Sequence, residues 1–76
     1  MGKLGPVTWQ KFEKFLCKQG CRFERQTASH RVYWKPGLQR PLVVPKRKEL
    51  PVYVIRNNIR LLGISVEDYL KFLDQL

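Results

Sequence analysis

Residues 21–35 read CRFERQTASHRVYWK, two strand-like runs separated by a short polar turn. The first run, residues 21–27, alternates apolar and charged side chains, and the second, residues 31–35, is β-branched and aromatic, both typical of strands. A third run, residues 39–44, follows a Pro-Gly turn signal and is closed by Pro45. Three short strands in series with tight connections predict an antiparallel meander.

Apolar residues at helical spacing flank this sheet. Thr8 is placed to cap a helix that Gly20 ends. Residues 52–62 repeat apolar side chains every three or four positions, which predicts a second helix with Gly63 as its left-handed C-cap. Ser65, three residues before an aspartate, is the expected N-cap of a last helix.

The length of 76 residues allows one small core, and 43% hydrophobic residues are enough to fill it. We therefore expect a single α+β domain over residues 1–76. Its elements should follow in the order helix, strand, strand, strand, helix, helix. A three-stranded antiparallel sheet would then be covered by helices on one face and open to solvent on the other.

The charge of the chain is strongly positive and unevenly spread. Its 15 lysines and arginines against 6 acids give a net charge of +9. Residues 21–48 alone carry +7, whereas residues 49–76 carry −1. A basic middle of this kind is typical of a protein that binds a polyanion, above all nucleic acid. A basic surface kept for solubility is the plain alternative, and a membrane surface is disfavoured because no helix pairs a basic face with a broad aromatic one.

No apolar run approaches the roughly 20 residues that a membrane helix needs, and the first residues are too polar for a signal peptide, so we expect a cytoplasmic protein. Cys17 and Cys21 are then expected to be reduced and structural. One histidine and two thiols fall short of a zinc site, and the acids are scattered along the chain. We expect neither a metal nor a small-molecule cofactor.

His30 is the only histidine, and it lies among Arg25, Arg31 and Lys35. RNA carries its own nucleophile, the 2′-hydroxyl. Its scission needs a base for that proton, a cation beside the phosphorus and an acid for the leaving oxygen. An imidazole ordinarily titrates near neutral pH, which suits the role of base without a metal. The acid stays open between Lys35, water and His30 itself in the second half of the reaction.

Several short motifs lie along the whole chain: Gly2-Lys3-Leu4, the helix end at Gly20, Arg25-Gln26 with Ser29-His30, the strand end Val44-Pro45, and the run from Arg56 to Gly63-Ile64-Ser65. Together they resemble the HicA toxin family. The resemblance implies a fold similar to the double-stranded RNA-binding domain and the activity of an mRNA interferase, held inactive by a HicB-type antitoxin. It also implies that the catalytic histidine is the one in the family's Gly-Ser-His motif, which Ser29-His30 matches.

Three positions depart from that family pattern. Ala28 stands where the family has glycine, and its Cβ is expected to force a less strained turn than the positive φ that glycine allows. Arg47 stands where many members carry a second histidine. Tyr53-Val54 replaces the Gly-Thr that often opens the second helix, so this helix is expected to begin differently. His30 itself is retained.

Strand alternation raises a question about the direction of His30. Strict alternation places it on the same side as Val32 and Trp34, an apolar side. The imidazole would then turn inward unless a bend near Ala28-Ser29 re-aims it. Tyr33 and Trp34 are candidates to stack RNA bases, with at least one of them expected in the core.

The sequence thus predicts a metal-independent endoribonuclease that uses His30 as its general base. The expected RNA contacts are the nearest cations and one hydroxyl: Arg25, Ser29, Arg31, Lys35, Lys46 and Arg47. A noncatalytic RNA-binding module of the same fold is the main alternative. A DNA-reading helix-turn-helix over residues 52–73 is a further one, disfavoured because this segment is nearly neutral and its second helix is acidic.

Overall fold

The computed structural model describes residues 3–76, so Met1 and Gly2, and with them the start of the Gly2-Lys3-Leu4 motif, lie outside the described residues. The elements in chain order are α1 (Trp9–Lys18), β1 (Arg22–Thr27), β2 (His30–Trp34), β3 (Leu42–Pro45), α2 (Val52–Leu62) and α3 (Val66–Asp74). The strands form one antiparallel sheet in the order β1-β2-β3. The predicted α+β class and the order of elements are confirmed.

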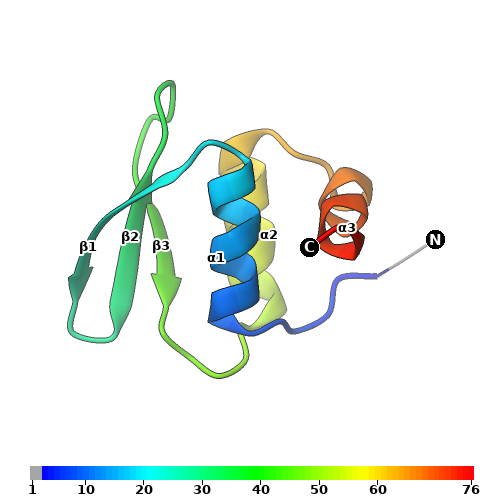
Figure 1. Ribbon diagram of the computed structural model, residues 1–76, viewed down its shortest axis with the longest axis horizontal. Helices are drawn as coiled ribbons and strands as arrows, with labels where there is room; N and C mark the ends of the chain where they lie inside the picture. Colours follow the sequence, from blue (N-terminus) through cyan, green and yellow to red (C-terminus); the bar gives the residue numbers. More distant parts are fainter. Residues whose placement is uncertain (1–2) are drawn as a thin grey trace.

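The elements are stacked in layers, with the sheet on one side, α1 and α2 beside it, and α3 beyond them (Figure 1). Phe12 and Phe15 of α1 and Ile55 of α2 are fully buried in the core that these layers share. The ring of Tyr69 in α3 lies 4.9 Å from that of Phe15, centroid to centroid. Helices therefore cover one face of the sheet as predicted, while α3 covers the helices.

The core-facing side of the central strand β2 is the side of Tyr33. This residue is fully buried and pairs with Leu42 of β3, which is also fully buried. Because neighbours along a strand face opposite sides, His30 and Val32 lie on the other face of the sheet. Val32 is buried there, outside the main core. No bend is needed to turn His30 away from the core.

An irregularity in β1 changes the direction of its side chains. Phe23 pairs with Tyr33, but Arg25 already pairs with Val32, so Glu24 is an extra residue between them, a β-bulge. Without it, Phe23 and Arg25 would face the same side. The bulge places Arg25 on the face of the sheet that carries Val32 and His30.

The turn between β1 and β2 consists of Ala28 and Ser29, and Ala28 has a φ of 47°. The prediction that alanine forces a less strained turn is therefore wrong. Two-residue hairpin turns need positive φ because their twist must match that of the strands. Alanine accepts this conformation here at a cost of roughly 1–2 kcal/mol.

The predicted helix ends are confirmed. The hydroxyl of Thr8 accepts a hydrogen bond from the Lys11 amide at 3.2 Å, and that of Ser65 accepts one from the Asp68 amide at 3.1 Å. Gly63 closes α2 with a φ of 73°. These caps satisfy amide and carbonyl groups that would otherwise lack partners at the helix ends.

The third strand begins later than predicted, at Leu42 instead of Gln39. Pro41 has no amide hydrogen, so it cannot donate to a strand ladder. Gln39 and Arg40 form a bend before it. Arg40 is therefore exposed and lies outside the sheet.

The two cysteines are free thiols, as predicted, with Cys17 exposed and Cys21 buried. Burial raises the pKa of the Cys21 thiol. Within residues 3–76, no helix has both the length and the apolar character needed to cross a membrane.

Candidate nucleic-acid interface

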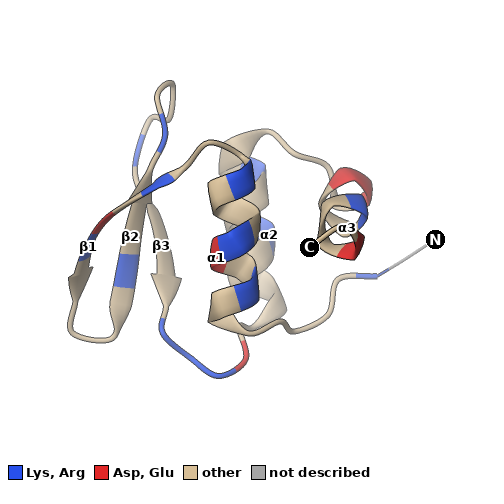
Figure 2. Ribbon diagram, viewed as in Figure 1, with Lys and Arg blue, Asp and Glu red and all other residues tan. Residues whose placement is uncertain are grey.

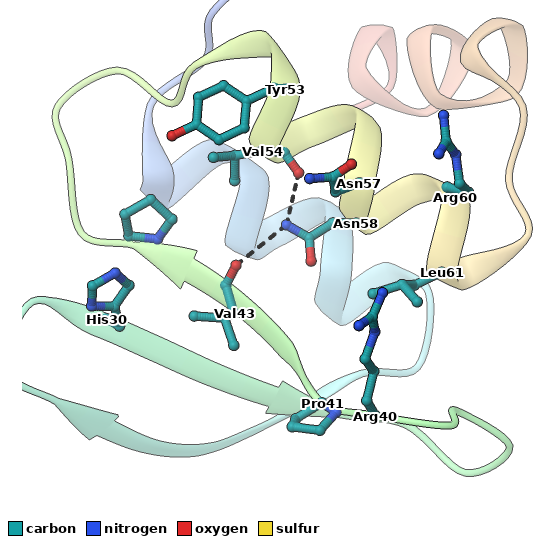
Figure 3. A pocket seen from close by; sticks show the side chains of 11 residues that line it. His30, Arg40, Pro41, Val43, Tyr53, Val54, Asn57, Asn58, Arg60 and Leu61 are labelled. Carbon is teal, nitrogen blue, oxygen red and sulfur yellow. Dashed lines mark hydrogen bonds between the residues drawn. The ribbon is translucent and has the colours of Figure 1, made fainter.

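A groove of about 540 Å³ lies between α2 and the face of the sheet that carries His30 (Figure 3). The sheet side contributes His30 from β2 and Val43 and Pro45 from β3. The other side is lined by residues of α2 and of the loop before β3: Arg40, Pro41, Tyr53, Val54, Asn57, Asn58, Arg60 and Leu61. The groove thus joins the imidazole to two arginines distant in sequence.

His30 is the first residue of β2 and pairs with Thr27 of β1 and Pro45 of β3. Its side chain is exposed and lies at one end of the groove. Strand pairing on both sides fixes its backbone, so the imidazole is held on a rigid element but is open to solvent. This is the position that a proton acceptor for a bound substrate requires.

The turn before His30 is tied to the loop after β3. The backbone amide of Lys46 donates to the carbonyl of Ser29 at 2.6 Å, one step beyond the His30–Pro45 pair. Ser29 and Arg47 are both exposed beside this junction. The structure therefore brings Ser29, Arg47 and, through the bulge in β1, Arg25 to the same region as His30.

Arg31 lies on the opposite face from His30 and its guanidinium is already engaged. Its Nη2 is 2.7 Å from Oε2 of Glu13 in α1, and its Nε donates to the Tyr33 hydroxyl at 3.1 Å. Its Cζ lies 4.1 Å from the ring centroid of Phe23 and 5.0 Å from that of Trp9. These contacts fasten β2 to α1, and they leave this side chain remote from the groove.

The hydroxyl of Tyr33 completes this cluster by donating to Glu13. Burial, with a contribution from the Glu13 carboxylate, raises the pKa of Tyr33 to about 12. Tyr33 therefore remains a neutral donor over the physiological range. Its burial beneath the sheet excludes it as a base-stacking residue, whereas Trp34 is half-buried on the other face.

The side chains of two other predicted contacts also point away from His30. The Nζ of Lys46 is 5.5 Å from the centroid of the Trp9 ring, on the side of the sheet occupied by Arg31. Lys35 is packed near Gly20 beyond the far end of β2. Five residues of extended chain separate it from His30, a span of roughly 16 Å. The structure therefore does not bring Lys35 to the imidazole as a candidate acid.

Sequence reasoning missed the part of the groove formed by Arg40, Tyr53, Asn57 and Arg60. The last three recur at positions i, i+4 and i+7, which places them on one face of α2. The sequence shows this polar stripe, but the helix prediction rests on the apolar stripe of the same helix alone. Arg40 had no such signal, because its approach to α2 depends on how the chain folds.

Asn58 fixes α2 against the sheet beneath the groove. It is 4% exposed, and its Nδ2 donates to the carbonyls of Val54 at 2.9 Å and Val43 at 3.4 Å. The second of these bonds joins α2 to the outer strand β3 (Figure 3). A buried polar residue with satisfied bonds gives the groove a defined width.

Arg40 and Arg60, the charged residues that line the groove, are both positive, and so are most charges on the elements nearer the N-terminus. Figure 2 shows lysines and arginines on α1, on the sheet and in the loop after β3, each with a single acid among them, whereas α3 carries mostly acids. Within residues 3–76, no group of three or more histidine, cysteine, aspartate or glutamate side chains is placed to hold a metal ion.

These features define a class of protein: a small basic α+β domain whose open groove joins an imidazole to arginines, as binding to nucleic acid requires. The model of one family, described as the HicA toxin of bacterial toxin–antitoxin pairs, matches residues 9–64, from the start of α1 to the residue after Gly63. The chain therefore belongs to the HicA toxin family. No curated protein and no solved structure matches it.

Membership gives the chain its biological setting. It supports an endoribonuclease that acts as the toxin of a toxin–antitoxin pair, with RNA as substrate and an antitoxin as partner. The matched segment includes every residue that lines the groove, whereas α3 lies outside it.

Proposed function

We propose that the protein is a metal-independent endoribonuclease, an mRNA interferase that cleaves at the His30 end of the groove. The observation that carries the proposal is the exposed imidazole at the end of a groove lined by arginines, on a strand fixed by pairing on both sides. Family membership supports the same activity.

The chemistry needs only groups that RNA and this site supply. His30 removes the proton of a ribose 2′-hydroxyl, and the 2′-oxygen attacks the adjacent phosphorus. The bond from phosphorus to the 5′-oxygen breaks, which leaves a 2′,3′-cyclic phosphate and a 5′-hydroxyl. The leaving oxygen takes its proton from water or from the protonated His30. Lys35 is not assigned this role because it lies at the other end of β2.

Of the six contacts predicted from the sequence, we propose that Arg25, Ser29 and Arg47 touch the substrate near the scissile phosphate. All three are exposed. Arg25 lies on the same face of the sheet as His30, Ser29 directly precedes His30, and Arg47 follows the residue whose amide bonds the Ser29 carbonyl. An arginine fork can hold the nonbridging oxygens as negative charge develops on them. Arg31 and Lys46 act indirectly, because their cluster with Trp9 positions the strand and the loop beside His30.

We further propose that the partner is a HicB-type antitoxin acting in the cytoplasm, where mRNA is present. An acidic or aromatic segment laid over the basic sheet would compete with RNA for the same charges. The exposed face around Arg25 and Arg47 is suited to such a segment.

The experiment is a cleavage assay with purified protein, RNA and an excess of EDTA. We expect cleavage that yields 2′,3′-cyclic phosphate ends and that stops when the nucleotide at the cleavage site carries a 2′-deoxyribose. Cleavage that is abolished by EDTA and restored by a divalent metal would contradict metal independence. Binding of RNA with no cleavage under any condition would favour the noncatalytic module.

A further inference from the structure

The end of the groove remote from His30 carries two arginines that the proposed chemistry does not use. Arg40 comes from the bend before β3 and Arg60 from the last turn of α2, and both side chains lie at that end (Figure 3). Both residues are exposed. The ion pairs formed within residues 3–76 involve Arg22 and Arg31, so acids of the described chain do not neutralise either groove arginine.

Tyr53 lies on the wall of the groove that α2 forms, in the first turn of that helix. It is 65% exposed, more than any other large hydrophobic residue of the described chain. Exposure of an aromatic ring is costly in a domain this small, since the same ring would add to the core if buried. An exposed ring beside a basic groove is instead suited to stacking on a nucleic-acid base.

The groove is long enough for more than one nucleotide. From Leu42 to Pro45 the chain runs along β3 for roughly 10 Å. From Tyr53 to Arg60 it runs along α2 for about 10 Å. The volume of about 540 Å³ falls in the range of ligand pockets and is far too small for a base-paired helix. A single strand fits these dimensions.

We propose that this groove is a track for single-stranded RNA, in which Tyr53 stacks a base near the scissile linkage while Arg40 and Arg60 bind a phosphate at least one nucleotide away. The inference rests on the proposed function for the identity of the substrate. The inference adds the path of the RNA along the protein and the requirement that the RNA be single-stranded. Asn57, between Tyr53 and Arg60 on the same helix face, is placed to hydrogen-bond the strand.

The test measures binding and not cleavage, so that it fails or succeeds independently of the role of His30. Protein carrying His30→Ala is titrated into a labelled single-stranded oligoribonucleotide at several salt concentrations. Adding Arg40→Gln and Arg60→Gln should weaken binding about tenfold and reduce the slope of log affinity against log salt by about 0.7, the value for one lost phosphate contact on a single strand.

The matched control adds Arg56→Gln and Lys71→Gln to the same His30→Ala background. These two exposed cations lie on α2 and α3 outside the groove, and their loss lowers the net charge equally. We expect less than half the loss of affinity seen with the groove pair. Equal losses from the two pairs would overturn the proposal, because the groove arginines would then act through overall charge alone.

Tyr53 is tested by comparing Tyr53→Ala with Tyr53→Phe. The phenyl ring keeps the stacking surface, so Phe should bind like the parent, while Ala should lose about tenfold. Both variants keep the fold, since the side chain is largely exposed, and urea denaturation verifies this. Unchanged binding by the Ala variant would overturn the assignment, as would an equal loss in both variants.

Repeating the titrations with a duplex of the same sequence tests the form of the substrate. The groove variants should weaken binding of the single strand much more than binding of the duplex. If they weaken both equally, the single-strand track is wrong. If RNA binding is unchanged but the variants no longer bind a cognate antitoxin, the groove is a protein-docking site and the proposal is overturned.

Discussion

The Nη2 atom of Arg31 lies 2.7 Å from Oε2 of Glu13, and this ion pair joins β2 to α1 on the face of the sheet opposite His30. The two side chains are 17% and 27% exposed, so the pair is largely shielded from water. It is supported by the Tyr33 hydroxyl and by the rings of Phe23 and Trp9. An arginine in the most basic segment of the chain thus holds two elements of the fold together.

Glu13→Gln should destabilise the protein by about 1–3 kcal/mol, because it leaves the shielded guanidinium without its carboxylate. Urea denaturation measures the loss. The control is Glu24→Gln, which breaks the ion pair with Arg22, whose side chain is 73% exposed. That change should cost under about 0.5 kcal/mol. Similar losses in the two variants would show that the Glu13 pair has no special role.

Ala28→Gly should stabilise the protein by about 0.5–1 kcal/mol. The φ of 47° at Ala28 is strained for alanine and free for glycine, although glycine also gains entropy in the unfolded chain. Ala28→Val should have the opposite effect, since a β-branched residue resists positive φ. A glycine variant that unfolds at lower urea than the parent would contradict the conformation assigned to this turn.

Asn58→Ala should destabilise the fold by about 1–3 kcal/mol, because the carbonyls of Val54 and Val43 lose their buried donor. It should also loosen α2 against β3, which hydrogen exchange of the α2 amides would detect as weaker protection. Asn57→Ala is the matched control on the exposed face of the same helix. If both variants have the same stability as the parent, Asn58 does not fix the wall of the groove.

The hydroxyl of Tyr69 is buried and, within the described residues, has no hydrogen-bond partner. Tyr69→Phe should therefore leave stability unchanged or raise it by up to about 1 kcal/mol. Tyr33→Phe should lower it, since the Tyr33 hydroxyl donates to Glu13 and accepts from Arg31. Thermal unfolding of the two variants distinguishes these outcomes, and equal effects would contradict the assignment.

Burial raises the pKa of Tyr69 from its ordinary value of 10.0 to about 12. The folded state therefore favours the neutral phenol. The stabilisation that this gives the folded state is fully present below pH 10. As pH rises from 10 towards 12, the unfolded chain releases this proton first and stability falls. Tyr69→Phe should make the free energy of unfolding less dependent on pH in this window, and an unchanged dependence would count against the buried phenol.

Local signals in the sequence predicted much of the fold. The caps at Thr8 and Ser65 and the glycine end of α2 depend on neighbouring residues only, and all three are confirmed. The turn at Ala28 was predicted wrongly because alanine's preference against positive φ is weaker than the demand of the two paired strands. Tertiary pairing there outweighs local propensity.

The site was harder to predict because it is assembled over long sequence distances. His30 could be identified from its residue type and neighbours, but the face of Arg25 depends on the bulge at Glu24, which alternation does not show. The engagement of the Arg31 guanidinium depends on Glu13, 18 residues earlier. The approach of Arg40 to α2 arises only when β3 packs beside that helix.

The most direct test of the central claim is the single-turnover rate of RNA cleavage by the wild type and by His30→Ala, in excess EDTA at saturating protein. Loss of a general base should lower the rate by about 10²–10⁴-fold while RNA binding and the free energy of unfolding stay close to those of the wild type. Equal cleavage rates in the two proteins would contradict the account, since the imidazole would then have no part in the chemistry.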